Sequence, residues 1–215
     1  MEFVIIITAV LLIIPLGYAV RTRGRGKEAP AKSSENASDV SGIIQAVIVP
    51  CRVIISRSLG SLAEADVIDV CKNYRMGADS LFALRKKIGQ TFDLKSNRES
   101  EGVYLNYMIE AAEKIAETAR HIVISPSFRI SISDKCEIQV LQQVIDRIED
   151  KDFDLPAVAD NKDFLEHLIA ERSKSMAIED FNDGAQAYSY LTMLFYLHTF
   201  LNSYFRTVTI YSEVV

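Results

Sequence analysis

Near the middle of the chain, three glutamates follow one another at a spacing that suits metal binding. Residues three and four apart share one face of a helix, so these side chains form one acidic stripe. Their like charges repel, and a bound cation would relieve the repulsion because hard cations prefer carboxylate oxygens. Neighbouring cations offer a second source of relief, because Lys114 can pair with Glu110, and Arg120 or His121 can pair with Glu117. We favour this solvated stripe and keep a divalent or iron ion as the alternative. The stripe consists of Glu110, Glu113 and Glu117.

The other chemistry-bearing residues form no catalytic motif, and the sequence predicts that the protein is not an enzyme. The histidines lack the His-x-x-x-His spacing of a metal site, and no Ser, Cys or Lys stands in a nucleophile signature. The nine glycines are scattered rather than gathered in a phosphate-binding loop. Three widely separated cysteines indicate neither a disulfide framework nor a zinc site, so we expect reduced and mostly buried thiols. These residues are His121, His167, His198, Cys51, Cys71 and Cys136.

The N-terminal residues 1–20 are typical of a membrane anchor. The uncharged run from Phe3 to Val20 would span about 27 Å as a helix, close to the thickness of a bilayer's hydrocarbon core. A cleaved signal peptide is the alternative, although the run lacks a basic residue before it. Basic residues follow at once and predict a cytoplasmic domain on a single-pass protein of the cell membrane. They also suit anionic headgroups, although a plain stop-transfer flank is the simpler interpretation. The basic cluster is Arg21, Arg23, Arg25 and Lys27.

The remainder of the chain is acidic. The chain carries a formal net charge of −5, and five of its basic residues lie between positions 21 and 32, so residues 33–215 are more acidic still. Nucleic-acid binding needs a basic face, and we therefore expect no nucleic-acid partner.

Apolar periodicity predicts an all-α fold, with one N-terminal transmembrane helix followed by a six-helix bundle. Residues 21–41 are rich in Gly, Ser and charge and predict a flexible linker, and residues 42–215 form the helical domain. Pro50 should kink the first helix or mark its true start. The helix lengths follow a similar order in the segments 42–124 and 134–212, which indicates a duplicated three-helix unit. The predicted helices cover about 42–59, 62–90, 99–124, 134–151, 157–180 and 185–212.

The last predicted helix admits two interpretations. Residues 187–205 carry no formal charge and could form a second membrane span, but their many hydroxyl and amide side chains favour burial in the bundle. The apolar stripe of this helix is best read as core, and a face for a protein partner is the second interpretation. The candidate partner face is Tyr190, Leu194, Leu197 and Tyr204.

Two adjacent stretches resemble the PhoU family. The run LNYMIEAAEKIAETARHIV, residues 105–123, resembles the end of a PhoU repeat, with Glu113 and Glu117 on the acidic positions of the family. The preceding run GSLAEADVIDVCKNYRMGADSLFALRKKI, residues 60–88, resembles the helix before it, with Asp79 on the second acid. Arg75 stands where the first acid of that helix belongs. The motif resemblance covers about 60–123, and the architectural one about 42–213.

The resemblance implies a bundle of two three-helix repeats that regulates phosphate transport, as in the cytoplasmic C-terminal domain of sodium/phosphate cotransporters. Some members bind metal clusters through paired acids, which here implies Glu113 and Glu117 as ligands, with Glu110 and Asp79 as helpers. The second repeat has Leu201 at one of its acidic positions and Phe205 at the other.

The function expected from these features is that of a membrane-anchored regulatory module that binds and modulates a transporter of phosphate or a related anion. Anchoring would raise its effective concentration beside such a partner. The alternative is a membrane-tethered helical scaffold that acts through self-association, as a homo-oligomer, or through another protein, without a role in transport.

Overall fold

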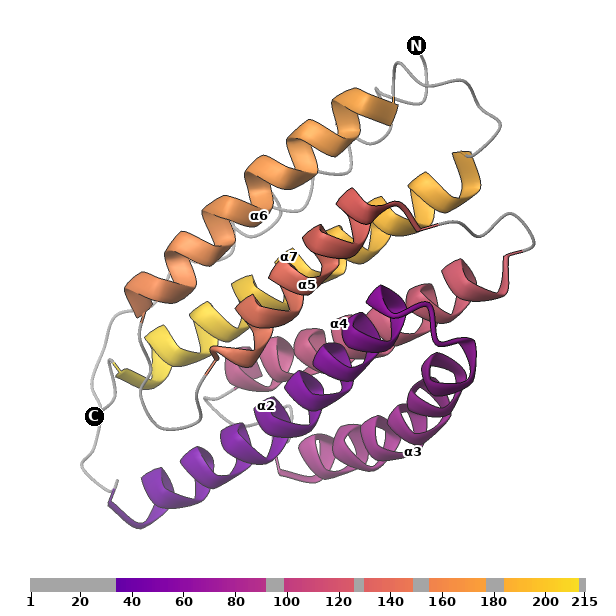
Figure 1. Cartoon of the computed structure of the whole chain (residues 1–215). Helices are drawn as coiled ribbons and strands as arrows, with labels where there is room; N and C mark the ends of the chain where they lie inside the picture. The colour runs from indigo at the N-terminus through magenta and orange to yellow at the C-terminus, as the bar shows by residue number, and fades with distance from the viewer. Residues whose placement is uncertain (1–33, 92–98, 126–129, 149–154, 177–183, 213–215) are drawn as a thin grey trace, which may run out of the picture. The chain divides into compact units, whose positions relative to one another are not determined.

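The computed structural model describes residues 34–91, 99–125, 130–148, 155–176 and 184–212. Chain contacts separate Met1–Ala37 from Ser38–Val215, and the fold below is that of the second unit. Within the described ranges every element is a helix and no strand occurs, which confirms the all-α prediction (Figure 1). The helices are α2 (Ser34–Ala63), α3 (Val67–Thr91), α4 (Glu99–Ile124), α5 (Ile132–Asp146), α6 (Leu155–Met176) and α7 (Gly184–Ser212).

The first helix begins earlier than predicted. We expected a flexible linker over 21–41, but α2 starts at Ser34 and runs through Pro50. The polar stretch before Gly42 contains no proline, and its residues have only moderately poor helix propensity. Once the apolar part of the helix is packed, each added residue gains a backbone hydrogen bond, so the helix extends backward into the polar stretch. Composition alone therefore misplaced the boundary of the linker.

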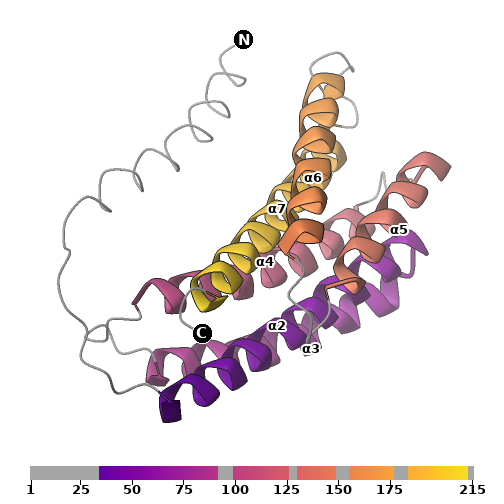
Figure 2. The same ribbon diagram turned by 90° about the vertical axis from the view of Figure 1, so that its left-hand side faces the viewer.

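Helices α4 and α7 pack against each other, and each carries one further helix. Helix α3 packs on α4, and α6 packs on α7, so that α3 and α6 lie at opposite edges of the bundle (Figures 1 and 2). The buried side chains of α4 recur every three or four residues, as an amphipathic helix requires. They include Leu105, Met108, Ala112, Ile115, Ala119 and Ile122, which meet Met193, Leu197, Phe200, Leu201 and Tyr204 of α7 within one continuous core.

Helix α2 closes the core beside α3 and α5. Ile54 lies so near α3 that a Cβ at Gly77 would approach its Cγ2 to 3.2 Å, which explains the small residue there. Toward α5, Gln142 donates to the Ser56 hydroxyl at 3.4 Å, and Arg52 donates to the backbone carbonyl of Ile148. Helix α2 is thus held to α5 by polar contacts, and to α3 both by apolar contact and by a hydrogen bond from Asn73 to the Ser61 hydroxyl at 3.0 Å.

Gln45–Ala63 is the one stretch of the described chain that is long and apolar enough to cross a membrane. Half of its most apolar window is buried inside the bundle, where Val47, Ile55 and Leu59 belong to the core. Residues 187–205, the candidate second span, belong to α7, whose apolar side chains line the same core. The predicted anchor at 1–20 and the basic cluster at 21–27 lie outside the described residues.

The turn from α2 to α3 is stabilised by backbone and side-chain hydrogen bonds. The amide of Asp66 donates to Ser61 O at 3.0 Å and that of Ala65 to Leu62 O at 3.0 Å, the pattern of a Schellman motif. Asp66 also caps α3, because its carboxylate accepts from the amide of Asp69 at 2.9 Å. Ala65 has φ 55°, a left-handed conformation that glycine usually supplies.

We therefore expect Ala65→Gly to raise the free energy of unfolding by about 1 kcal/mol, because glycine adopts the left-handed conformation without strain. Urea unfolding of the full chain in mild detergent, followed by far-UV circular dichroism, would measure the change. Ala83→Gly is the matched control, since Ala83 lies exposed within α3 and the same substitution there should cost about 0.5–1 kcal/mol. Equal losses in both variants would contradict the assigned turn.

Candidate functional site

The four predicted metal ligands are not assembled into a metal site. Within the described part of the chain, no group of three or more His, Cys, Asp or Glu side chains is arranged to hold a metal ion. Glu113 instead pairs with Arg85 of α3 at 2.6 Å, and Glu117 pairs with Lys114 at 2.8 Å. Glu110 and Asp79 have exposed side chains on α4 and α3. The acidic stripe is therefore solvated and balanced by neighbouring cations.

The local partners of the stripe differ from those that spacing suggested. Lys114 was expected to pair with Glu110, but it donates to Glu117, and this hydrogen bond raises the pKa of its ammonium group. Arg120 was an expected partner of Glu117, but its guanidinium lies over the ring of Tyr74, 5.3 Å from the centroid. Helical spacing gives several partners of equal reach, and the neighbouring helix selects among them.

Three residues of the candidate partner face lie inside the bundle. Leu194, Leu197 and Tyr204 expose at most 2% of their surface, and Tyr190 is half-buried against the same core. A partner could reach them only if α7 separated from its neighbours. The structure therefore favours the first interpretation of this stripe, as core.

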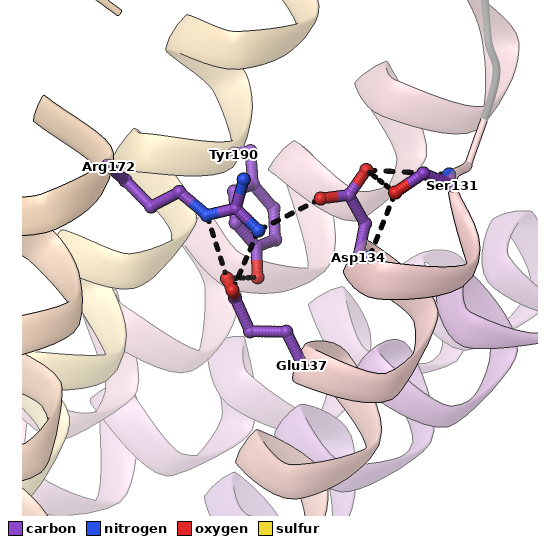
Figure 3. Close-up of polar contacts among 5 residues, drawn as sticks. All are labelled: Ser131, Asp134, Glu137, Arg172 and Tyr190. Carbon is purple, nitrogen blue, oxygen red and sulfur yellow. Dashed lines mark hydrogen bonds and ion pairs between the residues drawn. The ribbon is translucent and has the colours of Figure 1, made fainter. Parts of the chain in front are cut away.

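A cluster of polar side chains joins α5, α6 and α7, and we call it the three-helix cluster (Figure 3). Its centre is Arg172 of α6, whose guanidinium donates to Asp134 at 2.9 Å and to Glu137 at 2.7 and 3.3 Å. Tyr190 of α7 donates its hydroxyl proton to Glu137, and its ring lies 5.5 Å from the guanidinium carbon. The cluster comprises Ser131, Asp134, Glu137, Arg172 and Tyr190.

The start of α5 positions the two carboxylates. Ser131 is the N-cap, and its hydroxyl accepts from the amide of Asp134 at 3.0 Å while the Asp134 carboxylate returns to the Ser131 backbone, forming a capping box. Asp134 and Glu137 are three residues apart and therefore project from one side of α5, where a single guanidinium can reach both. A capping signal in the sequence thus sets the geometry of an interhelical contact.

The electrostatics of the cluster favour stability over catalysis. The hydrogen bond to Glu137 raises the pKa of Arg172, and burial together with that same carboxylate raises the pKa of Tyr190. The guanidinium thus stays charged and the phenol stays protonated, and both donate to Glu137. A carboxylate so engaged has little capacity left to act as a general base. The cluster is best described as a clamp between three helices.

A second polar contact joins α6 to α7. His198 lies 2.9 Å from the Glu166 carboxylate, which Lys162 also approaches at 3.4 Å. The hydrogen bond from His198 lowers the pKa of Glu166. His198 lies on the apolar helix α7, where its side chain is hydrogen-bonded and 24% exposed.

The thiols are less buried than expected. All three cysteines are free, but only Cys51 is buried, while Cys71 is half-buried and Cys136 is exposed on α5. Cys136 lies on the side of α5 that faces solvent, whereas Ile138 and Leu141 lie on the side that faces the core.

No protein-family profile matches the chain, and a search of curated proteins finds no significant match. Sequence reasoning overlooked the three-helix cluster, although one signal for it was present. The residues Ser131 to Asp134 spell S-x-x-D, which predicts a helix N-terminus. We instead predicted that this helix begins at about residue 134 and that a loop precedes it. No local pattern could have shown that Arg172 pairs with Asp134 and Glu137.

Loss of the central cation should weaken the bundle. We expect Arg172→Met to lower the free energy of unfolding by about 1–2 kcal/mol, because two partly buried carboxylates lose their ion pairs. Lys174→Met on the same helix removes only the exposed pair with Glu171 and should leave the free energy of unfolding nearly unchanged. Urea unfolding of both full-length variants makes the comparison, and an equal effect of the two would show that the cluster is no clamp.

The tyrosine of the cluster should make stability fall at alkaline pH. A free tyrosine ionises near about pH 10, and above that the unfolded chain releases a proton that folded Tyr190 retains because its pKa is raised. The contribution is therefore complete below about pH 10 and is lost as the pH rises further. Unfolding in urea between pH 8 and 11 should show a shallower decline for Tyr190→Phe than for the wild type. Tyr188→Phe, on the exposed side of α7, should keep the wild-type decline.

Proposed function

We propose that the chain is a membrane-anchored regulatory module of the PhoU-like kind, which binds and modulates a transporter of phosphate or a related anion. The observation that supports it most is the packing scheme of the bundle. Helix α3 packs on α4 as α6 packs on α7, and the last helices of the two halves, α4 and α7, pack on each other. Exchanging the halves leaves this scheme unchanged.

The first helices of the two halves fit the same scheme. Helix α2 contacts α5 through Ser56 and Gln142, and Gly60 lies where a Cβ would come within 2.9 Å of the Gln142 amide nitrogen. Two three-helix repeats would place their first helices against each other in this way, and two such repeats are the architecture that the resemblance over 60–123 implies. Fold alone does not give function, so the transporter is proposed on that resemblance together with the predicted anchor.

The proposed mechanism uses protein contact. The acids that would serve as ligands are paired with Arg85 and Lys114, and no step is assigned to a metal. Residues 1–20 would hold the domain at the cytoplasmic side of the membrane, where the partner's inward-facing surface lies. Binding there would occlude or release the transport path.

Affinity purification of the full-length protein from membranes in mild detergent, with mass spectrometry of the associated proteins, tests this proposal. We expect a phosphate or related anion transporter in stoichiometric amount, and altered phosphate uptake in cells that lack the protein. A fusion of residues 1–33 to an unrelated helical domain is the control, because it separates capture by the anchor from capture by the bundle. Recovery of the chain alone, or only with further copies of itself, would overturn the transporter in favour of a self-associating scaffold.

A further inference from the structure

Helix α3 presents an outward side that combines exposed apolar and basic residues, and we call it the outward face of α3. Ile68, Met76 and Phe82 expose 83%, 53% and 73% of their surface, which is high for residues of this size. All members recur at helical spacing and are exposed, whereas Val70, Leu81 and Ile88 on the opposite side are buried. The face consists of Ile68, Lys72, Arg75, Met76, Asp79, Phe82, Ala83 and Lys86.

The charge of this face is opposite to that of the chain. Helix α3 carries five basic residues and two acidic ones, although the whole chain has a net charge of −5. On the face itself, Lys72, Arg75 and Lys86 stand against Asp79 alone. Among the described residues, none of these three cations makes an ion pair with a carboxylate. They are therefore available to an anionic surface.

We propose that the outward face of α3 docks on an anionic membrane surface, with Ile68, Met76 and Phe82 entering the headgroup region. Exposed apolar side chains can enter the headgroup region of a bilayer, and each basic residue near an anionic surface strengthens binding about fivefold. The centres of protein interfaces are depleted in lysine, and here Lys72 and Lys86 lie beside the apolar residues. The spacing of the charges therefore favours lipid over a second copy of the chain.

The fold leaves this face accessible. Helix α3 lies at one edge of the bundle (Figure 1). Helices α4 and α2 contact it through Arg85, Tyr74, Gly77 and Asn73, none of which belongs to the outward face. Docking would hold the domain close to the bilayer in one orientation. This goes beyond the proposed anchor, which tethers the domain without orienting it.

Because the chain contains no tryptophan, a single Phe82→Trp substitution gives an unambiguous fluorescent reporter. The full-length variant would be reconstituted into vesicles of brominated phosphatidylglycerol and, separately, of brominated phosphatidylcholine. We expect a blue shift and bromine quenching in phosphatidylglycerol alone, both reversed by high salt. Tyr188→Trp on α7 is the matched control, since its side chain is also exposed and should not be quenched in either lipid.

A charge-reversed form of the reporter, carrying Lys72→Glu, Arg75→Glu and Lys86→Glu, should weaken docking at least about 100-fold and abolish the quenching. These side chains are exposed, and circular dichroism would verify that the helices are retained. Equal quenching in both lipids, or none in phosphatidylglycerol, would overturn the proposal. A blue shift that depends on protein concentration and not on lipid would overturn it in favour of a second copy. Flotation of the chain with phosphatidylcholine vesicles reports on the anchor separately, so failure of docking is distinguishable from failure of the anchor.

Discussion

The contact between α4 and α7 is the one on which the remaining packing depends. Both helices are long, and each buries an apolar stripe in the common core. Alanines of α4, including Ala112 and Ala119, are fully buried and leave room for the large side chains of α7, such as Phe200 and Tyr204. Helices α3 and α6 then attach to the outer sides of this pair. Separation of α4 from α7 would therefore disrupt the most extensive helix contact in the described part of the chain.

Apolar burial determines which helices meet, and polar contacts at the edges determine how they are aligned. The hydrophobic effect is non-directional and would tolerate some sliding of α6 along α7. Two sets of hydrogen bonds oppose such sliding: Arg172 reaches Asp134 and Glu137 of α5, and His198 reaches Glu166. Hydrogen bonds and ion pairs demand particular distances and angles, so a shift of one helical turn would break all of these contacts together. The clamp thus fixes the relative positions of helices whose packing is driven mainly by the burial of apolar surface.

Structural features that depend on residues close together in the chain could be predicted from the sequence, whereas contacts between distant residues could not. The helix over 99–124 was predicted with the bounds that the structure has, because its apolar period is regular and a proline follows it. The turn at Ala65 was missed because a Schellman motif normally announces itself with glycine. The start of α2 was misplaced because helix extension depends on packing further along the chain. Arg172 could not be assigned its partners, since nothing in the order of residues brings Glu137 and Tyr190 to it. Local signals therefore gave the elements, while the clamp required the fold.

The two halves of the bundle share a packing scheme but present different surfaces. Helices α3 and α6 occupy corresponding positions on α4 and α7, yet α3 is basic whereas α6 carries four acidic and three basic residues. In a bundle built from two repeats, core positions would be constrained by their neighbours in the same way in both halves, whereas outward positions would be free to diverge. Under the proposed docking, the difference in charge between α3 and α6 reflects the different surroundings of the two sides of the bundle. A chain held near a bilayer would meet lipid on one side and other proteins on the other, and the basic, partly apolar side of α3 is the one whose chemistry matches anionic lipid.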